Sequence, residues 1–118
     1  MDEVVTRRKN QPPPRHVVFD DLVHPGRETR RPWLHLLDDE TLPRVIESES
    51  PSLIVWSSLW PARPDALIRF DLADDGTGTS LRWTLLLDPP RPDHDAVRSM
   101  RKRIDRLING NLRHTYGQ

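Results

Sequence analysis

Apolar and polar residues alternate along much of the chain, and the alternation changes to helical spacing near residue 20 and at the C-terminus. A period of two predicts a strand, because successive side chains in a strand point to opposite faces of the sheet. This period predicts strands over residues 3–8, 43–49, 53–60, 66–73 and 79–88. Asp75-Gly76 connects the last two and predicts that they form a hairpin.

Spacings of three and four residues predict two helices. The first covers Arg15–Val23 and ends before Pro25-Gly26. The second runs from Asp93 to about Tyr116, and its apolar stripe consists of Val97, Met100, Ile104, Leu107, Ile108 and Leu112. Asp93 suits the N-terminal end of this helix and Gly117 suits a C-terminal cap. Asn109-Gly110-Asn111 interrupts the pattern and predicts a kink or an end, because glycine weakens a helix interior.

This order of elements predicts an α+β fold. One face of the antiparallel sheet must be covered, and the C-terminal helix is the only apolar element long enough to cover it. We therefore expect a curved antiparallel sheet wrapped around the long C-terminal helix, together with a short N-terminal helix. The length of 118 residues predicts a single domain over 1–118.

Composition narrows the function classes. The eighteen basic and eighteen acidic residues balance, so the chain has no net positive charge to attract nucleic acid. No nucleic-acid partner is therefore expected. Aliphatic runs such as Leu85–Leu87 are too short to span a membrane. The chain has no cysteine, and residues 1–10 lack the apolar core of a secretory signal, which together predict a cytoplasmic location.

Four local motifs occur in an order that resembles the START-like SRPBCC superfamily, in particular its polyketide cyclase/dehydratase-like branch. The first motif is a helix with Pro14, Val18, Phe19, Leu22 and Pro25. The second is a block of Glu47, Glu49, Pro51 and Leu53–Trp56. The third is the hairpin Asp75–Thr79 followed by Leu81 and Trp83, and the fourth is the long closing helix. The chain is shorter than such relatives between Gly26 and Pro43.

The resemblance implies a helix-grip fold with a cavity between the sheet and the long helix. Relatives use this cavity for lipids, sterols, polyketides or other apolar molecules. We therefore expect an apolar or amphipathic, lipid- or polyketide-like ligand, and no cofactor. The expected ligand-binding wall consists of Phe70, Trp83, Leu85, Met100, Ile104, Leu107 and Ile108. Gly110 would leave space near one end of this wall.

An enzyme of the cyclase/dehydratase kind is an alternative, and the sequence leaves open whether the protein is an enzyme. The family has no universal catalytic set, so the resemblance supplies no catalytic residue. Glu47 and Glu49 share one strand face and, with His35, are the first candidates for proton transfer. None of the five histidines has the spacing of a helical metal site, so no metal is expected.

Trp56 and Trp60 flank two serines, and in the predicted strand 53–60 they lie on the same face. Core packing, contact with a ligand and an exposed patch all remain open for these rings. In the last case the protein would be an interaction module without a usable cavity, and a homodimer would follow. The two serines lack the context of an exposed nucleophile and are expected to be ordinary strand residues.

Overall fold

The computed structural model describes residues 1–117, which include a five-stranded antiparallel sheet. The spatial order of the strands is β1-β5-β4-β3-β2, so β1 returns to the edge beside the last strand. The strands are β1 (Asp2–Gln11), β2 (Val45–Glu49), β3 (Leu53–Trp56), β4 (Leu67–Asp75) and β5 (Gly78–Leu87). The predicted strands occur in their expected order. The first is longer than predicted, and the strand expected from residue 43 begins two residues later.

The hairpin of β4 and β5 confirms the alternation in the sequence. Asp75 pairs with Gly78 across the turn, and Gly76 has a φ of 61°, which glycine adopts at little cost. Buried side chains on the inner face are Ile68, Phe70 and Leu72 from β4 and Leu81, Trp83 and Leu85 from β5. Arg69 and Arg82 are exposed to solvent. The hairpin therefore provides the central wall of the core.

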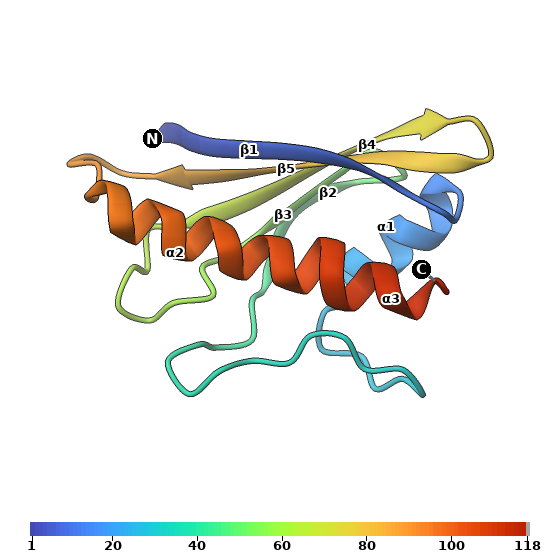
Figure 1. Ribbon diagram of the computed structural model, residues 1–118, viewed down its shortest axis with the longest axis horizontal. Helices are drawn as coiled ribbons and strands as arrows, with labels where there is room; N and C mark the ends of the chain where they lie inside the picture. Colours follow the sequence, from blue (N-terminus) through green and yellow to red (C-terminus); the bar gives the residue numbers. More distant parts are fainter. Residues whose placement is uncertain (118) are drawn as a thin grey trace.

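A long helical segment lies across the inner face of the sheet (Figure 1). It consists of α2 (His94–Asp105), the π-helix η1 (Arg106–Leu112) and α3 (Arg113–Thr115). Asp93 caps it, because its Oδ1 accepts a hydrogen bond from the Ala96 N–H at 2.8 Å. Gly117 follows the C-terminal end with a φ of 87°, as a terminal glycine should. The short N-terminal helix α1 (Arg15–Val23) has the predicted bounds.

The predicted irregularity at Asn109-Gly110-Asn111 takes a form other than a kink or an end. The helix continues to Thr115, and these residues lie inside the π-helical segment η1. A π-helix adds a residue to each turn and is usually found as a short insertion in an α-helix, frequently at a functional site. Gly110 is therefore placed where the backbone of the long helix is locally widened.

The strand predicted over residues 53–60 is too long. The strand β3 ends at Trp56, so Trp56 and Trp60 do not share one strand face. Beyond Trp56, serine hydroxyls accept hydrogen bonds from backbone N–H groups. Ser57 Oγ accepts from the Arg44 N–H at 2.7 Å, and Ser58 Oγ accepts from the Trp60 N–H at 2.9 Å. Such local bonds compete with a regular ladder. Both rings are nevertheless buried, Trp56 at 1% exposure and Trp60 at 9%.

Residues 24–44 connect α1 to β2 without a helix or strand, and we call this segment the connecting loop. In Figure 1 it runs below the long helix, on the side away from most of the sheet. Trp33 is buried within this loop. An ordered loop of this length is uncommon in a compact domain and is usually functional.

Candidate functional site

The connecting loop is fixed to the long helix by a buried ion pair. Arg103 Nε donates to Glu40 Oε2 at 2.7 Å, and Arg103 Nη2 donates to Glu40 Oε1 at 2.8 Å. The side chain of Glu40 is only 1% exposed and that of Arg103 is 16% exposed. Burial raises the free energy of the Glu40 anion, but the bonds from Arg103 and from the Leu37 N–H outweigh this cost and lower the pKa of Glu40.

Trp33 fixes the loop at a second point. Its ring stacks on Trp56, with centroids 6.0 Å apart and planes inclined by 19°. Trp56 in turn meets Phe70 edge to face at 4.7 Å and donates its Nε1–H to the Leu22 carbonyl at 2.8 Å. The backbone carbonyl of Trp33 accepts a bond from Asn111 Nδ2 at 3.1 Å. The aromatic core therefore continues directly into the loop.

An apolar hollow of about 560 Å³ lies within the connecting loop, and we call it the loop hollow. The two ends of the loop approach each other there, since a Cβ added at Gly26 would lie 3.0 Å from Leu42 Cδ2. Its lining is mostly apolar and consists of Pro25, Gly26, Arg27, Glu28, Thr29, Pro32, Trp33, Leu34, Leu36 and Leu42. Leu42 is 50% exposed although it belongs to this lining.

A second hollow, of about 770 Å³, lies between the loop and the C-terminal part of the long helix. We call it the basic hollow, because all four of its ionisable side chains are basic: Arg31, His35, Arg106 and His114. Pro32, Gly110, Asn111, Thr115 and Gly117 complete its lining. Pro32 borders both the basic hollow and the loop hollow, so the two adjoin.

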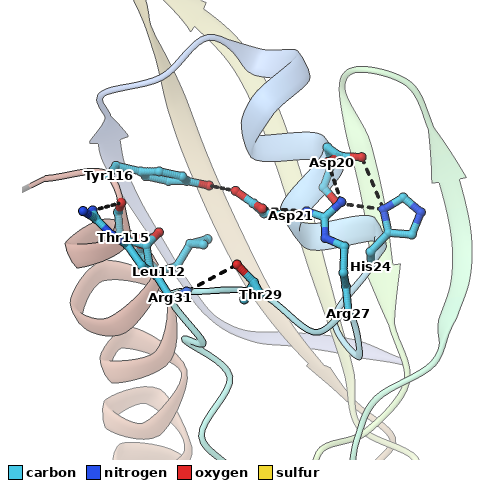
Figure 2. A network of polar contacts seen from close by, with 9 residues as sticks. All are labelled: Asp20, Asp21, His24, Arg27, Thr29, Arg31, Leu112, Thr115 and Tyr116. Atoms are coloured by element: carbon cyan, nitrogen blue, oxygen red, sulfur yellow. Dashed lines mark hydrogen bonds and ion pairs between the residues drawn. The ribbon is translucent and has the colours of Figure 1, made fainter.

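A polar network ties the end of α1 to the end of the long helix (Figure 2). Tyr116 donates its hydroxyl to Asp21 Oδ2 at 2.6 Å, and Arg27 bridges Asp21 and Asp20 at 2.9 and 2.7 Å. His24 Nδ1 lies 3.3 Å from Asp20. Burial and the Asp21 carboxylate both raise the pKa of Tyr116, so its phenol stays protonated and acts as a donor. The bond from Arg27 lowers the pKa of Asp20.

This network borders a smaller hollow of about 300 Å³, which Asp21, Tyr116 and Trp33 help to line. Arg31 lines both this hollow and the basic hollow, and its Nη1 donates to the Thr115 carbonyl at 3.2 Å. In Figure 2 the Arg31 side chain reaches the last helical turn while Arg27 reaches the two aspartates. Arg27 and Tyr116 bind the Asp20 and Asp21 carboxylates, and Arg31 forms no ion pair with them.

The seven residues of the expected ligand wall come together between the sheet and the long helix. Six of them are at most 1% exposed and belong to the core: Phe70, Trp83, Leu85, Ile104, Leu107 and Ile108. Met100 is partly buried and packs against that core. None of them lines the loop hollow, the basic hollow or the smaller hollow. In this structure these side chains pack against one another, and their contact with a ligand stays a prediction.

A partly buried chain of amides and a carboxylate links the sheet to the long helix. Trp83 Nε1 and Asn109 Nδ2 both donate to Asp105 Oδ1, at 3.2 and 2.8 Å, and Gln11 Nε2 donates to Asn109 Oδ1 at 2.8 Å. Gln11 is fully buried, and its Oε1 has no hydrogen-bond partner among residues 1–117. Gln11 thus ties η1 to β1, and Trp83 ties the end of α2 to β5. The sequence pattern did not indicate these bonds.

The candidates for proton transfer lie apart. Glu47 and Glu49 are exposed on the edge strand β2, whereas His35 is exposed in the connecting loop, where it borders the basic hollow. Within residues 1–117, no group of three or more histidine and carboxylate side chains gathers closely enough to hold a metal ion. No helix in this part of the chain is both long and apolar enough to cross a membrane.

Sequence reasoning singled out His35 and Gly110, which line the basic hollow, but it gave no indication of Leu42 or Arg31 as lining residues. Neither Trp56 nor Trp60 lies on an exposed face, which corrects the basis of the interaction-module hypothesis. A homodimer stays a prediction, and it would have to use other surfaces.

Comparisons with known proteins place the fold. No protein-family model and no curated protein matches the chain. The crystal structure of CalU16 from Micromonospora echinospora matches with a TM-score of 0.52 and 20% identity, over 71% of this chain and 60% of that chain. The solution structure of the Aha1 dimer from Colwellia psychrerythraea matches with a TM-score of 0.60 and 14% identity, over 93% of this chain and 98% of that chain.

At these identities the matches show a shared fold and leave the activity open. The matched part spans less than two thirds of CalU16. The five-stranded antiparallel sheet and the long C-terminal helix agree with the predicted helix-grip architecture. The chain therefore has an α+β fold related to those of CalU16 and Aha1.

Proposed function

We propose that the protein binds an apolar or amphipathic small molecule, and that the apolar part of this molecule occupies the loop hollow. The observation that carries the proposal is the hollow itself: about 560 Å³ of space bordered by Trp33, Leu34, Leu36 and Leu42. This volume lies within the range of small-molecule sites, which are concave and mainly apolar.

The energetics of the loop support a ligand. Leu42 remains half exposed beside Trp33, so covering it would remove apolar surface from water, at about 25 cal/mol per Å². The walls are also held in place before any ligand arrives, by the Trp33–Trp56 stack and by the Glu40–Arg103 ion pair. A preorganised site avoids part of the entropy cost of ordering a loop on binding.

The space between the sheet and the long helix is the less favourable location for the ligand. A ligand that touched Trp83 or Ile108 would have to displace side chains that are already fully buried, and would lose their packing contacts. The seven-residue wall predicted from the sequence would therefore form a site only if the long helix moved away from the sheet. The lipid- or polyketide-like nature of the ligand rests on the family resemblance alone.

Binding can be tested by titrating tryptophan fluorescence with fatty acids and aromatic polyketides. Leu42→Asp places a charge in the loop hollow and is expected to weaken binding at least tenfold. Leu37→Asp is the matched control, because Leu37 is a similarly exposed leucine of the same loop that does not line the hollow. Absence of binding by the wild type across the panel, or equal weakening in both variants, would overturn the proposal.

A further inference from the structure

We propose that the basic hollow is a binding site for an oxyanion, that is, for the phosphate or carboxylate group of a small molecule. The proposal rests on charge and geometry at Arg31, His35, Arg106 and His114, and it stands whether or not the loop hollow takes an apolar ligand. The site lies outside the space between the sheet and the long helix, on the solvent side of that helix.

Within residues 1–117, no carboxylate lines the basic hollow or forms an ion pair with its two arginines. The chain as a whole is neutral, and six arginines form ion pairs with carboxylates among residues 1–117: Arg15, Arg27, Arg63, Arg69, Arg82 and Arg103. Neither Arg31 nor Arg106 takes part in such a pair. The guanidinium of Arg31 donates only to the neutral Thr115 carbonyl within the described residues. An anion in the hollow would supply the missing negative charge.

Two carboxylates near the basic hollow are engaged with other residues. Asp21, on the far side of Arg31, accepts bonds from Tyr116 and Arg27. Glu40 accepts both of its bonds from Arg103. Neither carboxylate can turn toward the hollow without breaking these contacts. Neither carboxylate therefore neutralises the guanidinium charges of Arg31 and Arg106.

The long helix leaves room for a ligand at this point. Gly110 lies in the π-helical segment η1 and borders the hollow, and it presents only backbone there. A Cβ added at Gly110 would lie 3.4 Å from Arg106 Cδ, so the glycine also lets the Arg106 side chain lie close to the helix. The Arg106 guanidinium therefore borders the basic hollow directly, because position 110 has no side chain that could stand between it and a ligand.

The opposite wall is held rigidly. Asn111 Nδ2 binds the Trp33 carbonyl at 3.1 Å, and Arg103 Nη2 donates to the His35 carbonyl. With the Arg31–Thr115 bond, these contacts fix the backbone on both sides of Pro32 to the helix. Guanidinium groups present paired N–H donors that match the oxygens of phosphate and carboxylate groups. A rigid hollow with two guanidinium groups and two imidazoles therefore selects an oxyanion.

The test is isothermal titration calorimetry at low ionic strength with inorganic phosphate, phenyl phosphate and benzoate. Saturable binding of at least one anion is expected. Phenyl phosphate and inorganic phosphate distinguish a phosphorylated organic ligand from free phosphate, and benzoate reports a carboxylate. Arg106→Gln and His114→Gln, both at exposed positions, are each expected to weaken binding, the first at least tenfold.

Arg98→Gln is the matched control, because Arg98 lies on the same helix, makes its side-chain contact with His94, and borders none of the three hollows. It should leave the affinity unchanged. Equal weakening in Arg98→Gln and Arg106→Gln would reveal nonspecific attraction and overturn the proposal, as would a lack of saturable binding of all three anions. Leu42→Asp should retain anion binding, which separates this site from the loop hollow.

Discussion

Glu40 and Arg103 lie 63 positions apart in the sequence and meet in a two-pronged ion pair at 2.7 and 2.8 Å. The pair joins the connecting loop to the long helix, and Arg103 also binds the His35 carbonyl. The Arg103 guanidinium therefore positions both the wall of the basic hollow at His35 and the loop end near Leu42. Because Glu40 is almost fully buried, loss of either partner would leave a charge or a polar group poorly solvated.

Glu40→Gln is expected to destabilise the protein by about 3 kcal/mol, because breaking a buried ion pair leaves the other charge uncompensated. The measurement is the free energy of unfolding in urea. Glu47→Gln is the control, since Glu47 is exposed on β2 and forms no ion pair within residues 1–117. A loss below 0.5 kcal/mol, or an equal loss in the control, would show that the pair does not hold the loop.

The same pair should make stability depend on pH. The pKa of Glu40 is lowered from its ordinary 4.5, so its contribution is present above that value and is lost as the pH falls through the lower pKa of the folded state. The free energy of unfolding should therefore decrease below about pH 4.5 more steeply in the wild type than in Glu40→Gln. A gap between the two proteins that stays constant from pH 6 to pH 3 would contradict this assignment.

Gly110 and Gly76 are expected to respond to alanine in opposite directions. Gly110 lies in a helix with negative φ, and an added methyl meets only the flexible Arg106 side chain, so Gly110→Ala should stabilise the protein by about 0.5 kcal/mol. Gly76 has a φ of 61°, so Gly76→Ala should destabilise it by about 1 kcal/mol. Urea unfolding measures both. Destabilisation by Gly110→Ala would mean that η1 needs glycine for its backbone.

Trp56→Phe should cost about 3 kcal/mol. The change removes the Nε1–H that satisfies the buried Leu22 carbonyl, and it also leaves space beside Trp33 and Phe70. The free energy of unfolding and the near-ultraviolet circular dichroism of the stacked rings report this loss. A stability within 0.5 kcal/mol of the wild type would show that Trp56 does not link α1, the sheet and the loop.

The helices and strands could be predicted from residues that lie close together in the sequence. The alternation in β4 and β5, the glycine turn between them and the apolar stripe of the long helix each contain enough local information to predict their form. The end of β3 could not be predicted from local sequence, because Ser57 and Ser58 can bond the backbone either inside or outside a ladder. The π-helical turn was located by its glycine, but its form depends on buried bonds such as that between Gln11 and Asn109.

The candidate site was largely beyond sequence reasoning for a related reason. The connecting loop has no periodic pattern, and its shape comes from distant partners such as Arg103 and Trp56. Leu42 and Arg31 consequently gave no signal of a common surface. The predicted wall residues lie together in the core, and periodicity cannot distinguish a wall around a cavity from a filled core.

The four tryptophans give the most direct test of where a ligand binds. Trp33 borders the loop hollow, whereas Trp83 lies fully buried in the grip. The measurement is a titration of the ¹⁵N-labelled protein with a bound fatty acid or polyketide, followed through the indole N–H signals, which Trp→Phe variants assign. We expect the Trp33 signal to shift most and the Trp83 signal to stay in place. A shift of Trp83 with Trp33 unchanged would contradict it and would place the ligand between the sheet and the long helix.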